Sequence, residues 1–291
     1  ATAVSEPLGS YIAPVPYTGS YIMSPMAIML AGSRDQKEKY LHAISNNEMH
    51  FGFGVTEYIA SRENAEIILN NKTANGRALF VMDGLNATHY ILTTKSGTIF
   101  IINANDPNLQ IVQLTTVDKT KDVSELILNS CQVEVLQKSV NDTSIIDKVI
   151  DAGRIMVAAD SLGASQSMID KSVNYSKERI QFGRVIGSFQ AVKHMCAEMT
   201  ANIQPCYSMV WYAAHCHDYI QEESRLMATH TKAHVSEVAS FIAKTSTEVH
   251  GGMGFTDELG LHYWFKRIGL NRQILGGVEV NREEAATVQN F

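Results

Sequence analysis

Three side chains suited to ligand binding lie close together just past the middle of the chain: Arg179, Gln181 and Phe182. They follow a helical pattern that breaks at Gly183, so a cation, an amide and an aromatic ring are presented at one helix end. A guanidinium can bind phosphate oxygens through two parallel hydrogen bonds. The segment therefore predicts a binding site for a phosphorylated, aromatic ligand. The alternative is an ordinary helix end, where cations are favoured and glycine is common.

A second stretch runs from Glu248 to Thr256 and contains the pair Gly251 and Gly252. Glycines allow a ligand to approach the backbone closely. No G-x-G-x-x-G motif follows a strand pattern and no Walker lysine is present, which excludes a Rossmann or P-loop nucleotide site. We expect this stretch to supply the other half of the site around Arg179.

Two further chemistries find little support in the sequence. His230 and His234 are spaced to share a helix face, but the Thr-Lys-Ala between them lacks the glutamate of an H-E-x-x-H zinc site and no third ligand is evident. No G-x-S-x-G elbow indicates a serine nucleophile. We therefore expect neither a metal centre nor a hydrolase.

Composition indicates an ordinary globular protein of 291 residues, with 45% hydrophobic residues and a net charge of −6. Lysines and arginines are scattered, which argues against a nucleic-acid or anionic-membrane surface. The four cysteines form no C-x-x-C pair, so a reduced, cytoplasmic setting is expected. The most apolar early run, Ile22 to Ala31, is broken by Ser24 and Pro25 and is too short to span a bilayer. We expect no targeting or membrane segment.

The hydrophobic pattern predicts helices, then a sheet, then helices again. Residues 1–19 are rich in Pro and Gly and predict an extended connector. Two helices follow, from Ser20 or Ser24 to Gly32 and from Ser33 or Asp35 to His42. Between residues 51 and 136 the texture is that of a compact sheet domain, with turns at Asn75-Gly76, Asp83-Gly84 and Ser96-Gly97. β-Branched and aromatic runs predict strands at residues 50–56, 65–69, 78–82, 88–94, 98–102, 110–115 and 132–136.

From Asn141 onward the pattern is helical. The expected helices span residues 145–178, 187–220, 223–250, 257–271 and 279–288, with breaks at Gly183, Pro205, Gly251-Gly252 and Gly276-Gly277. This predicts three domains: a partial N-terminal helical domain (1–49), a middle β domain (50–138) and a C-terminal helical bundle (139–291).

The two candidate stretches, in this order of elements, resemble the acyl-CoA dehydrogenase family of flavoproteins over essentially the whole chain. The resemblance implies an α+β fold with truncated N-terminal helices, a middle β-sheet domain and a C-terminal four-helix bundle. Residues 6–17 resemble the segment that joins the family's early helices, so we expect the first of those helices to be missing from this sequence. It also implies FAD as cofactor and an acyl-CoA substrate, which a glutamate deprotonates at Cα while hydride leaves Cβ for flavin N5.

On the ADP side of FAD, the resemblance carries over to several positions. Matches to the family's contacts are Arg179, Gln181, Phe182, Gln190, Gly251 and Gly252. Glu248 stands where the family has a glutamine, which places a negative charge near the phosphates. In the family these residues reach across the dimer interface to the FAD whose flavin ring lies in the neighbouring subunit.

On the flavin side, the family pattern is only partly kept. Thr56 matches a threonine that binds the pyrimidine edge of the flavin. Phe80 and Met82 match an aromatic residue and a hydroxyl residue that faces flavin N5, and a thioether cannot donate that hydrogen bond. The stretch from Tyr58 to Arg62 also departs from the family's acidic, glycine-rich sequence. We expect this chain's own flavin pocket to be weakened.

The two base positions known in the family are occupied here by Leu275 and Gly153, and neither residue can accept a proton. Loss of a general base typically costs about 100- to 10,000-fold in rate. The leading hypothesis is therefore a base-less subunit of a heteromeric α2β2 acyl-CoA dehydrogenase, paired with a homologous catalytic subunit. Residues 80–84 resemble the weaker subunits of family members that act on steroid side-chain CoA thioesters.

Two alternatives remain open. One is a homomeric dehydrogenase or oxidase with a relocated base, for instance Glu279. The other is a non-enzymatic structural or interaction protein that keeps the fold and binds no FAD.

Overall fold

The computed structural model describes residues 1–59 and 65–291. The chain forms two compact units: residues Val15–Gly153, here called the sheet unit, and Ala1–Pro14 together with Arg154–Phe291, here called the bundle unit. The three-domain division at residues 49/50 and 138/139 stays a prediction. Of the altered stretch after Glu57, Ala60, Ser61 and Arg62 lie outside the described residues.

The sheet unit begins with helical segments. A π-helix, η1 (Tyr17–Met23), leads into α2 (Ser24–Ala31), and α3 (Arg34–Ser45) follows. The start of α3 fits the predicted cap, because the Ser33 hydroxyl accepts from the Gln36 amide at 3.2 Å and the Gln36 side chain accepts from the Ser33 amide at 2.8 Å. The short helix α4 (Thr56–Ile59) and the 3-10 turn η2 (Gln137–Ser139) complete the helical parts before α5.

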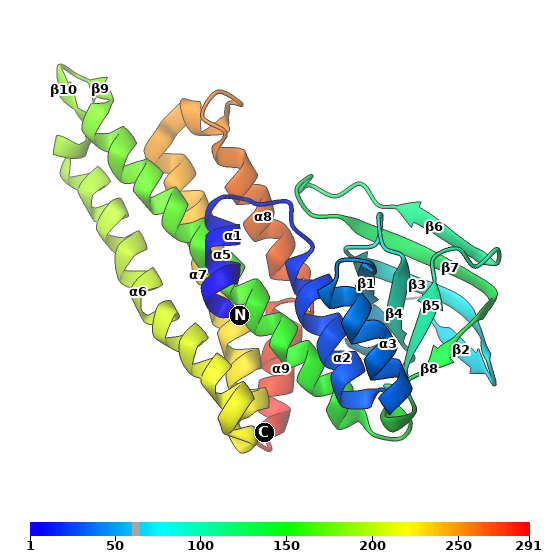
Figure 1. The fold of residues 1–291 in the computed structure, drawn as a ribbon. Helices are drawn as coiled ribbons and strands as arrows, with labels where there is room; N and C mark the ends of the chain where they lie inside the picture. The colour runs from blue at the N-terminus through cyan, green and yellow to red at the C-terminus, as the bar shows by residue number, and fades with distance from the viewer. Residues whose placement is uncertain (60–64) are drawn as a thin grey trace. The chain divides into compact units, whose positions relative to one another are not determined.

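The described residues form an eight-stranded sheet of order β6-β7-β3-β1-β4-β5-β8, with β2 on β3 (Figure 1). All pairs are antiparallel except β1 with β4. The strands are β1 (Phe51–Gly54), β2 (Ile67–Asn70), β3 (Thr73–Met82), β4 (His89–Thr93), β5 (Ile99–Asn103), β6 (Leu109–Gln113), β7 (Val123–Gln132) and β8 (Glu134–Val135). Apolar residues at alternating positions, such as Tyr90, Leu92, Phe100 and Ile102, form a buried core on one face.

Two sequence expectations for the sheet were wrong. Asn75-Gly76 is not a turn but lies inside β3, where a Cβ on Gly76 would come within 1.8 Å of the Glu66 carbonyl oxygen. The glycine is needed there for close approach of two backbones. The long strand β7 was not predicted, because its polar residues Asn129 and Ser130 interrupt the apolar pattern.

The bundle unit consists mainly of long helices. Helix α5 (Thr143–Glu178) starts in the sheet unit and continues into this one, followed by α6 (Gln190–Tyr219), α7 (Gln221–His250), α8 (Leu261–Gln273) and α9 (Val278–Val288). Figure 1 shows α5, α6 and α7 running alongside one another. Their buried apolar residues, including Met168, Ile203 and Ile242, form one core cluster. These helices agree with the predicted ones within a few residues at most ends.

Two expectations for the bundle unit were also wrong. Residues 1–19 were expected to be extended, but α1 (Thr2–Ser10) is a helix. Packing overrides its Pro and Gly content: the Ser5 hydroxyl donates to the Met156 carbonyl at 2.7 Å, and a Cβ on Gly9 would overlap the backbone of Asp160. Pro205 does not break α6, because it lies on the exposed face, where water can satisfy the carbonyl that loses its partner.

Candidate functional site

The hairpin between α5 and α6 carries the first candidate stretch. Helix α5 ends at Glu178, and β9 (Ile180–Gln181) pairs with β10 (Arg184–Val185), followed by the 3-10 turn η3 (Ile186–Ser188). The two-residue loop is Phe182-Gly183, with φ of +52° and +74°. A two-residue hairpin with both φ values positive is typical of a type I′ turn. The break predicted at Gly183 is confirmed.

The conformation of Phe182 is unusual for an aromatic residue. A non-glycine residue with positive φ stores strain, and such strain is concentrated at functional sites. The Phe182 side chain is also 91% exposed. The hairpin therefore holds a large ring out from the bundle unit at the point where a ligand or partner was predicted.

The structure brings this hairpin next to the glycine stretch at the end of α7. Together they line an open groove of about 650 Å³ in the bundle unit. The groove-lining residues predicted from the sequence are Arg179, Gln181, Phe182, Glu248, Gly251 and Gly252. These residues come from segments about 70 positions apart in the sequence, and the two predicted stretches line one groove.

The glycines at the end of α7 open one side of this groove. Helix α7 stops at His250, Gly251 has a φ of +58°, and the 3-10 turn η4 (Gly251–Phe255) follows. A Cβ added at Gly252 would meet no atom within 4 Å. The backbone is therefore accessible to a ligand that approaches this turn.

The groove is lined by side chains of opposite charge, and only the positive one favours an anionic ligand. Within residues 1–59 and 65–291, Arg179 makes no ion pair with another side chain. A cation without a protein counter-charge is available for a phosphate. Glu248 lines the same groove and brings a negative charge to it. The predicted effect of Glu248 on phosphate binding stays a prediction.

One wall of the groove is an aromatic pair that the sequence did not single out as a site. Tyr175 and His250 stack with ring centroids 4.6 Å apart. His250 Nδ1 lies 2.7 Å from the Ser246 carbonyl, so this nitrogen carries the hydrogen and donates it. Burial lowers the pKa of His250, which keeps the ring neutral. The sequence did offer a signal for this pair, because His250 lies within the second candidate stretch and Tyr175 lies four residues before Arg179.

Gln190 does not line the groove. It is the first residue of α6, and its Nε2 lies 2.9 Å from His194 Nε2. Its proposed contact with the nucleotide stays a prediction.

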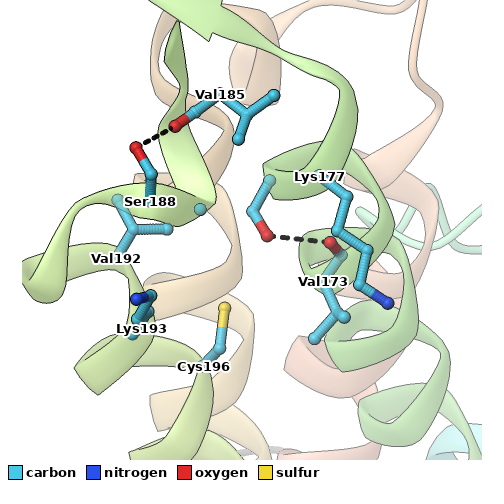
Figure 2. Close-up of a pocket in the computed structure, with 9 residues that line it drawn as sticks. Val173, Lys177, Val185, Ser188, Val192, Lys193 and Cys196 are labelled. Atoms are coloured by element: carbon cyan, nitrogen blue, oxygen red, sulfur yellow. Dashed lines mark hydrogen bonds between the residues drawn. The ribbon is translucent and has the colours of Figure 1, made fainter.

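A second cavity of about 540 Å³ lies between the end of α5, the hairpin and the start of α6 (Figure 2). Figure 2 shows Val173 and Lys177 on the α5 side and Lys193 and Cys196 on the α6 side. None of the residues predicted to bind FAD lines it. Lys177 is therefore a cation close in sequence to Arg179 that does not line the groove.

Thr56 lies in the sheet unit, next to a β-bulge of β3. Its hydroxyl donates to the Leu79 carbonyl at 2.6 Å, and the Leu79 amide donates to Glu57 at 3.0 Å. The register of β3 shifts between Ala78 and Val81, and Phe80 within this bulge has a φ of +53°. Thr56 and Glu57 thus bind the carbonyl and the amide of Leu79. Leu79 lies in β3, the strand that also contains the positions matched to flavin contacts.

Glu57 is buried within this arrangement. Burial raises the pKa of Glu57 to about 7, and its Oε2 has no hydrogen-bond partner among the residues that the structure describes. Met82, at the end of the strand, is also buried, and its thioether cannot donate a hydrogen bond. The predicted flavin contact at Thr56 and the predicted loss of one at Met82 stay predictions, and the Thr56 hydroxyl donates to the Leu79 carbonyl in this structure.

The first base position, Leu275, lies in the turn between α8 and α9. Its side chain is 5% exposed, its φ is +60°, and its carbonyl accepts from Arg154 Nε at 3.0 Å. The second position, Gly153, is buried on α5, next to Arg154 in the sequence. Neither position holds a group that can take a proton.

Beside this turn lies an ion cluster that the sequence did not reveal. Arg154 is fully buried and donates to both carboxylate oxygens of Glu284, at 2.6 and 2.8 Å. Arg225 donates to the same carboxylate at 2.7 Å. Burial alone would raise the pKa of Glu284, but the hydrogen bonds and charge of Arg154, with the charge of Arg225, hold it below its usual value.

Metal binding receives no support from the described parts of the chain. Residues 1–59 and 65–291 contain no group of three or more His, Cys, Asp or Glu side chains arranged to hold a metal ion. The same residues include no helix that is both long and apolar enough to cross a membrane.

Comparison with known proteins identifies the family. The acyl-CoA dehydrogenase C-terminal domain matches residues 143–288. The acryloyl-CoA reductase (NADH) of Anaerotignum propionicum is 26% identical over 301 residues, which cover 96% of this chain and 76% of the relative. This chain belongs to the acyl-CoA dehydrogenase family, and its cofactor is FAD.

Solved structures confirm the predicted α+β fold class. Butyryl-CoA dehydrogenase of Megasphaera elsdenii has a TM-score of 0.89 at 23% identity, with 100% of this chain and 81% of that chain covered. A structure described as a steroid ACAD has a TM-score of 0.87 at 21% identity, with 99% and 80% covered. Membership in the acyl-CoA dehydrogenase family supports the family activity, FAD-dependent α,β-desaturation of acyl-CoA, for this chain.

Proposed function

We propose that this chain is the base-less subunit of a heteromeric acyl-CoA dehydrogenase and that its groove holds the ADP half of an FAD whose flavin ring lies in a homologous catalytic subunit. The observation that carries the proposal is Leu275. It occupies the base position in a turn whose backbone is held by buried side chains, and yet it offers no proton acceptor.

No nearby carboxylate is a good replacement for the base. Glu279 is 82% exposed in its side chain and lies 3.8 Å from Arg272, so its carboxylate faces water and a cation instead of an enclosed site. Glu284 is held by two arginines and has a lowered pKa. A carboxylate in either setting is a poor base for an α-proton. The homomeric alternative with a relocated base is therefore disfavoured.

The groove supports the second half of the proposal. Its cation, its accessible glycine backbone and its aromatic wall suit a nucleotide diphosphate. Large apolar side chains near it are exposed: Ile180 by 61%, Phe182 by 91% and Phe255 by 80%. Exposed apolar side chains that gather around a binding site are typical of a surface covered by a partner.

When bound, FAD supplies the acceptor for the hydride that leaves Cβ. The residues of this chain hold the diphosphate through Arg179 and the backbone at Gly251 and Gly252, and they place the hairpin ring of Phe182 beside the nucleotide. A partner supplies the base. The steroid ACAD structure, whose description names Tcur3481 together with Tcur3483, supports pairing between unlike subunits and a bulky acyl group.

The purified chain alone is expected to show no acyl-CoA desaturation above about one hundredth of the rate of the assembled enzyme, because both base positions are apolar. The measurement is reduction of an electron acceptor with short-chain and steroid side-chain acyl-CoA substrates, with and without the co-expressed homologous subunit. A desaturation rate for the chain alone equal to that of the complex would refute the proposal. Loss of that rate in Glu279→Gln would then identify the relocated base.

Flavin content distinguishes the non-enzymatic alternative. We expect the 450 nm absorbance of FAD to co-purify with the complex. A complex that forms but carries no flavin under FAD-replete conditions would favour a structural role for the fold.

Glu248→Gln is expected to tighten FAD binding by about 3- to 10-fold, because removal of a negative charge near phosphates relieves roughly 1 kcal/mol of repulsion. The measurement is fluorescence titration of the FAD-free complex at low salt. Glu258→Gln, which removes an exposed charge outside the groove lining, is the matched control and should leave the affinity unchanged. Weaker binding by the Glu248 variant would mean that this carboxylate accepts a hydrogen bond from the nucleotide.

A further inference from the structure

The turn between α8 and α9 is held by a buried lysine that the proposed function does not use. Lys232, on α7, is 1% exposed. Its Nζ lies 3.1 Å from the Arg272 carbonyl, 3.3 Å from the Gly276 carbonyl and 3.3 Å from the Ser236 hydroxyl. Among the described residues it has no carboxylate within ion-pair distance.

The two carbonyls are on either side of position 275. Helix α8 ends at Gln273, so the Arg272 carbonyl belongs to its last turn, where carbonyls lack helical partners. The Gly276 carbonyl belongs to the turn itself. The negative end of the α8 dipole and the carbonyl oxygens together favour an amine donor at this place.

Other side chains also donate to carbonyls of the turn. Asn281 donates to the Gly276 and Gly277 carbonyls, each at 2.9 Å, and Arg154 donates to the Leu275 carbonyl. Lys232 is the member of this set that connects the turn to the end of α8. Removing it takes the lysine donor from the Arg272 carbonyl and leaves the Gly276 carbonyl with the Asn281 amide, and the lost hydrogen bonds cost free energy.

We propose that Lys232 is a positioning residue, which sets the place of residue 275 by joining the end of α8 to the α8–α9 turn. The inference rests on the proposed function only in that position 275 is a base position. It does not depend on FAD, on a partner or on the residue at 275. The side chains of Lys232, Asn281 and Arg154 bind the backbone carbonyls of the turn and not the side chain at position 275. The turn therefore keeps its conformation when that residue is leucine.

Burial and the charges around Lys232 make the stability of the α8–α9 turn depend on pH. Burial, then the charges of Arg154 on α5 and Arg272 on α8, lower the pKa of Lys232 to about 7. On α7, Arg225 also carries a positive charge, and the carboxylate of Glu284 on α9 is paired with Arg154 and Arg225. Glu279, which is highly exposed, is the other α9 charge close to Arg272.

Proton linkage gives the direction of this pH dependence. When the turn opens and Lys232 meets water, its pKa returns towards 10.5, so the open form binds more protons between pH 7 and 10.5. Rising pH therefore favours the closed turn across that window. Below about pH 7 both forms are charged and the preference no longer changes.

The test is hydrogen exchange of the full-length chain, read by mass spectrometry on peptides that cover residues 272–278. After correction for intrinsic exchange, wild-type protection of this turn should rise by roughly tenfold or more from pH 7 to pH 9. In Lys232→Met the turn should be about tenfold less protected at pH 9, with no rise with pH. Lys244→Met, an exposed lysine on the same helix, should behave as wild type.

The experiment separates this inference from the proposed function, because exchange in the isolated chain needs neither catalysis nor cofactor. If Lys232→Met fails to fold, the wild-type pH profile alone decides the matter. A profile that is flat for residues 272–278 while peptides of α5 and α6 keep their protection would overturn the inference. Equal protection of the turn in a folded Lys232→Met variant and in wild type would do the same.

Discussion

Replacing Arg179 by alanine is expected to weaken FAD binding by the assembled enzyme by about 100-fold or more. Arg179 is the cation of the groove without an ion-pair partner among the described residues, and a guanidinium on a diphosphate makes two charge-assisted hydrogen bonds. Each such bond contributes about 1.5 to 3 kcal/mol, so two account for at least two powers of ten in affinity. FAD content after gel filtration and titration of the FAD-free complex give the affinity.

Lys177→Gln is the matched control for this variant. Lys177 lies two residues earlier, carries the same charge and lines the second cavity instead of the groove (Figure 2). It should leave FAD affinity within about twofold of wild type, since only long-range charge is lost. If the Arg179 variant retained FAD as wild type does, the groove would not be the diphosphate site. Equal losses in both variants would show that general charge, not the contact, is responsible.

Glu284→Ala is expected to lower the free energy of unfolding by about 1.5 to 3 kcal/mol, because it removes the carboxylate that accepts two hydrogen bonds from the fully buried Arg154. Urea unfolding at pH 7 followed by circular dichroism measures the loss. Glu283→Ala removes the neighbouring exposed carboxylate and should change stability by no more than about 0.5 kcal/mol. A Glu284 variant as stable as that control would show that the ion cluster contributes nothing.

The same cluster predicts how stability depends on pH. The folded pKa of Glu284 is lowered, so the unfolded chain binds this proton more readily. The stabilisation is therefore fully present above the ordinary carboxyl pKa, near 4.5, and is lost as pH falls through the lower folded pKa. Wild type should lose more stability than Glu284→Ala between pH 5 and pH 3.

The groove was predictable because its chemistry is local. Arg179, Gln181 and Phe182 sit within four residues at a helix end, and Gly251 and Gly252 end another helix. Such ends are marked in the sequence by glycine and by the end of an apolar pattern. In a bundle whose successive helices are antiparallel, α5 and α7 run in the same direction, so their C-terminal ends lie on the same side and can meet in one groove.

The parts that were missed depend on contacts between distant segments. Arg154 and Glu284 are 130 positions apart, and nothing in either local sequence indicates the partner. The same holds for Lys232 with its two carbonyls. Helix α1 was missed because its stability comes from packing against α5, which outweighs the propensities of its proline and glycine. Local sequence patterns therefore predict many helix ends, whereas contacts between distant segments, such as these ion pairs and buried hydrogen bonds, depend on tertiary packing.

The measurement that bears most directly on the central claim is the ratio of FAD to subunits in the complex of this chain with its homologous catalytic subunit, taken from flavin absorbance and native mass spectrometry. A base-less subunit that lends its ADP-side groove and has a weakened flavin pocket predicts one FAD per heterodimer. Two FAD molecules per heterodimer, or a full complement of FAD on the chain alone together with desaturation, would contradict the account.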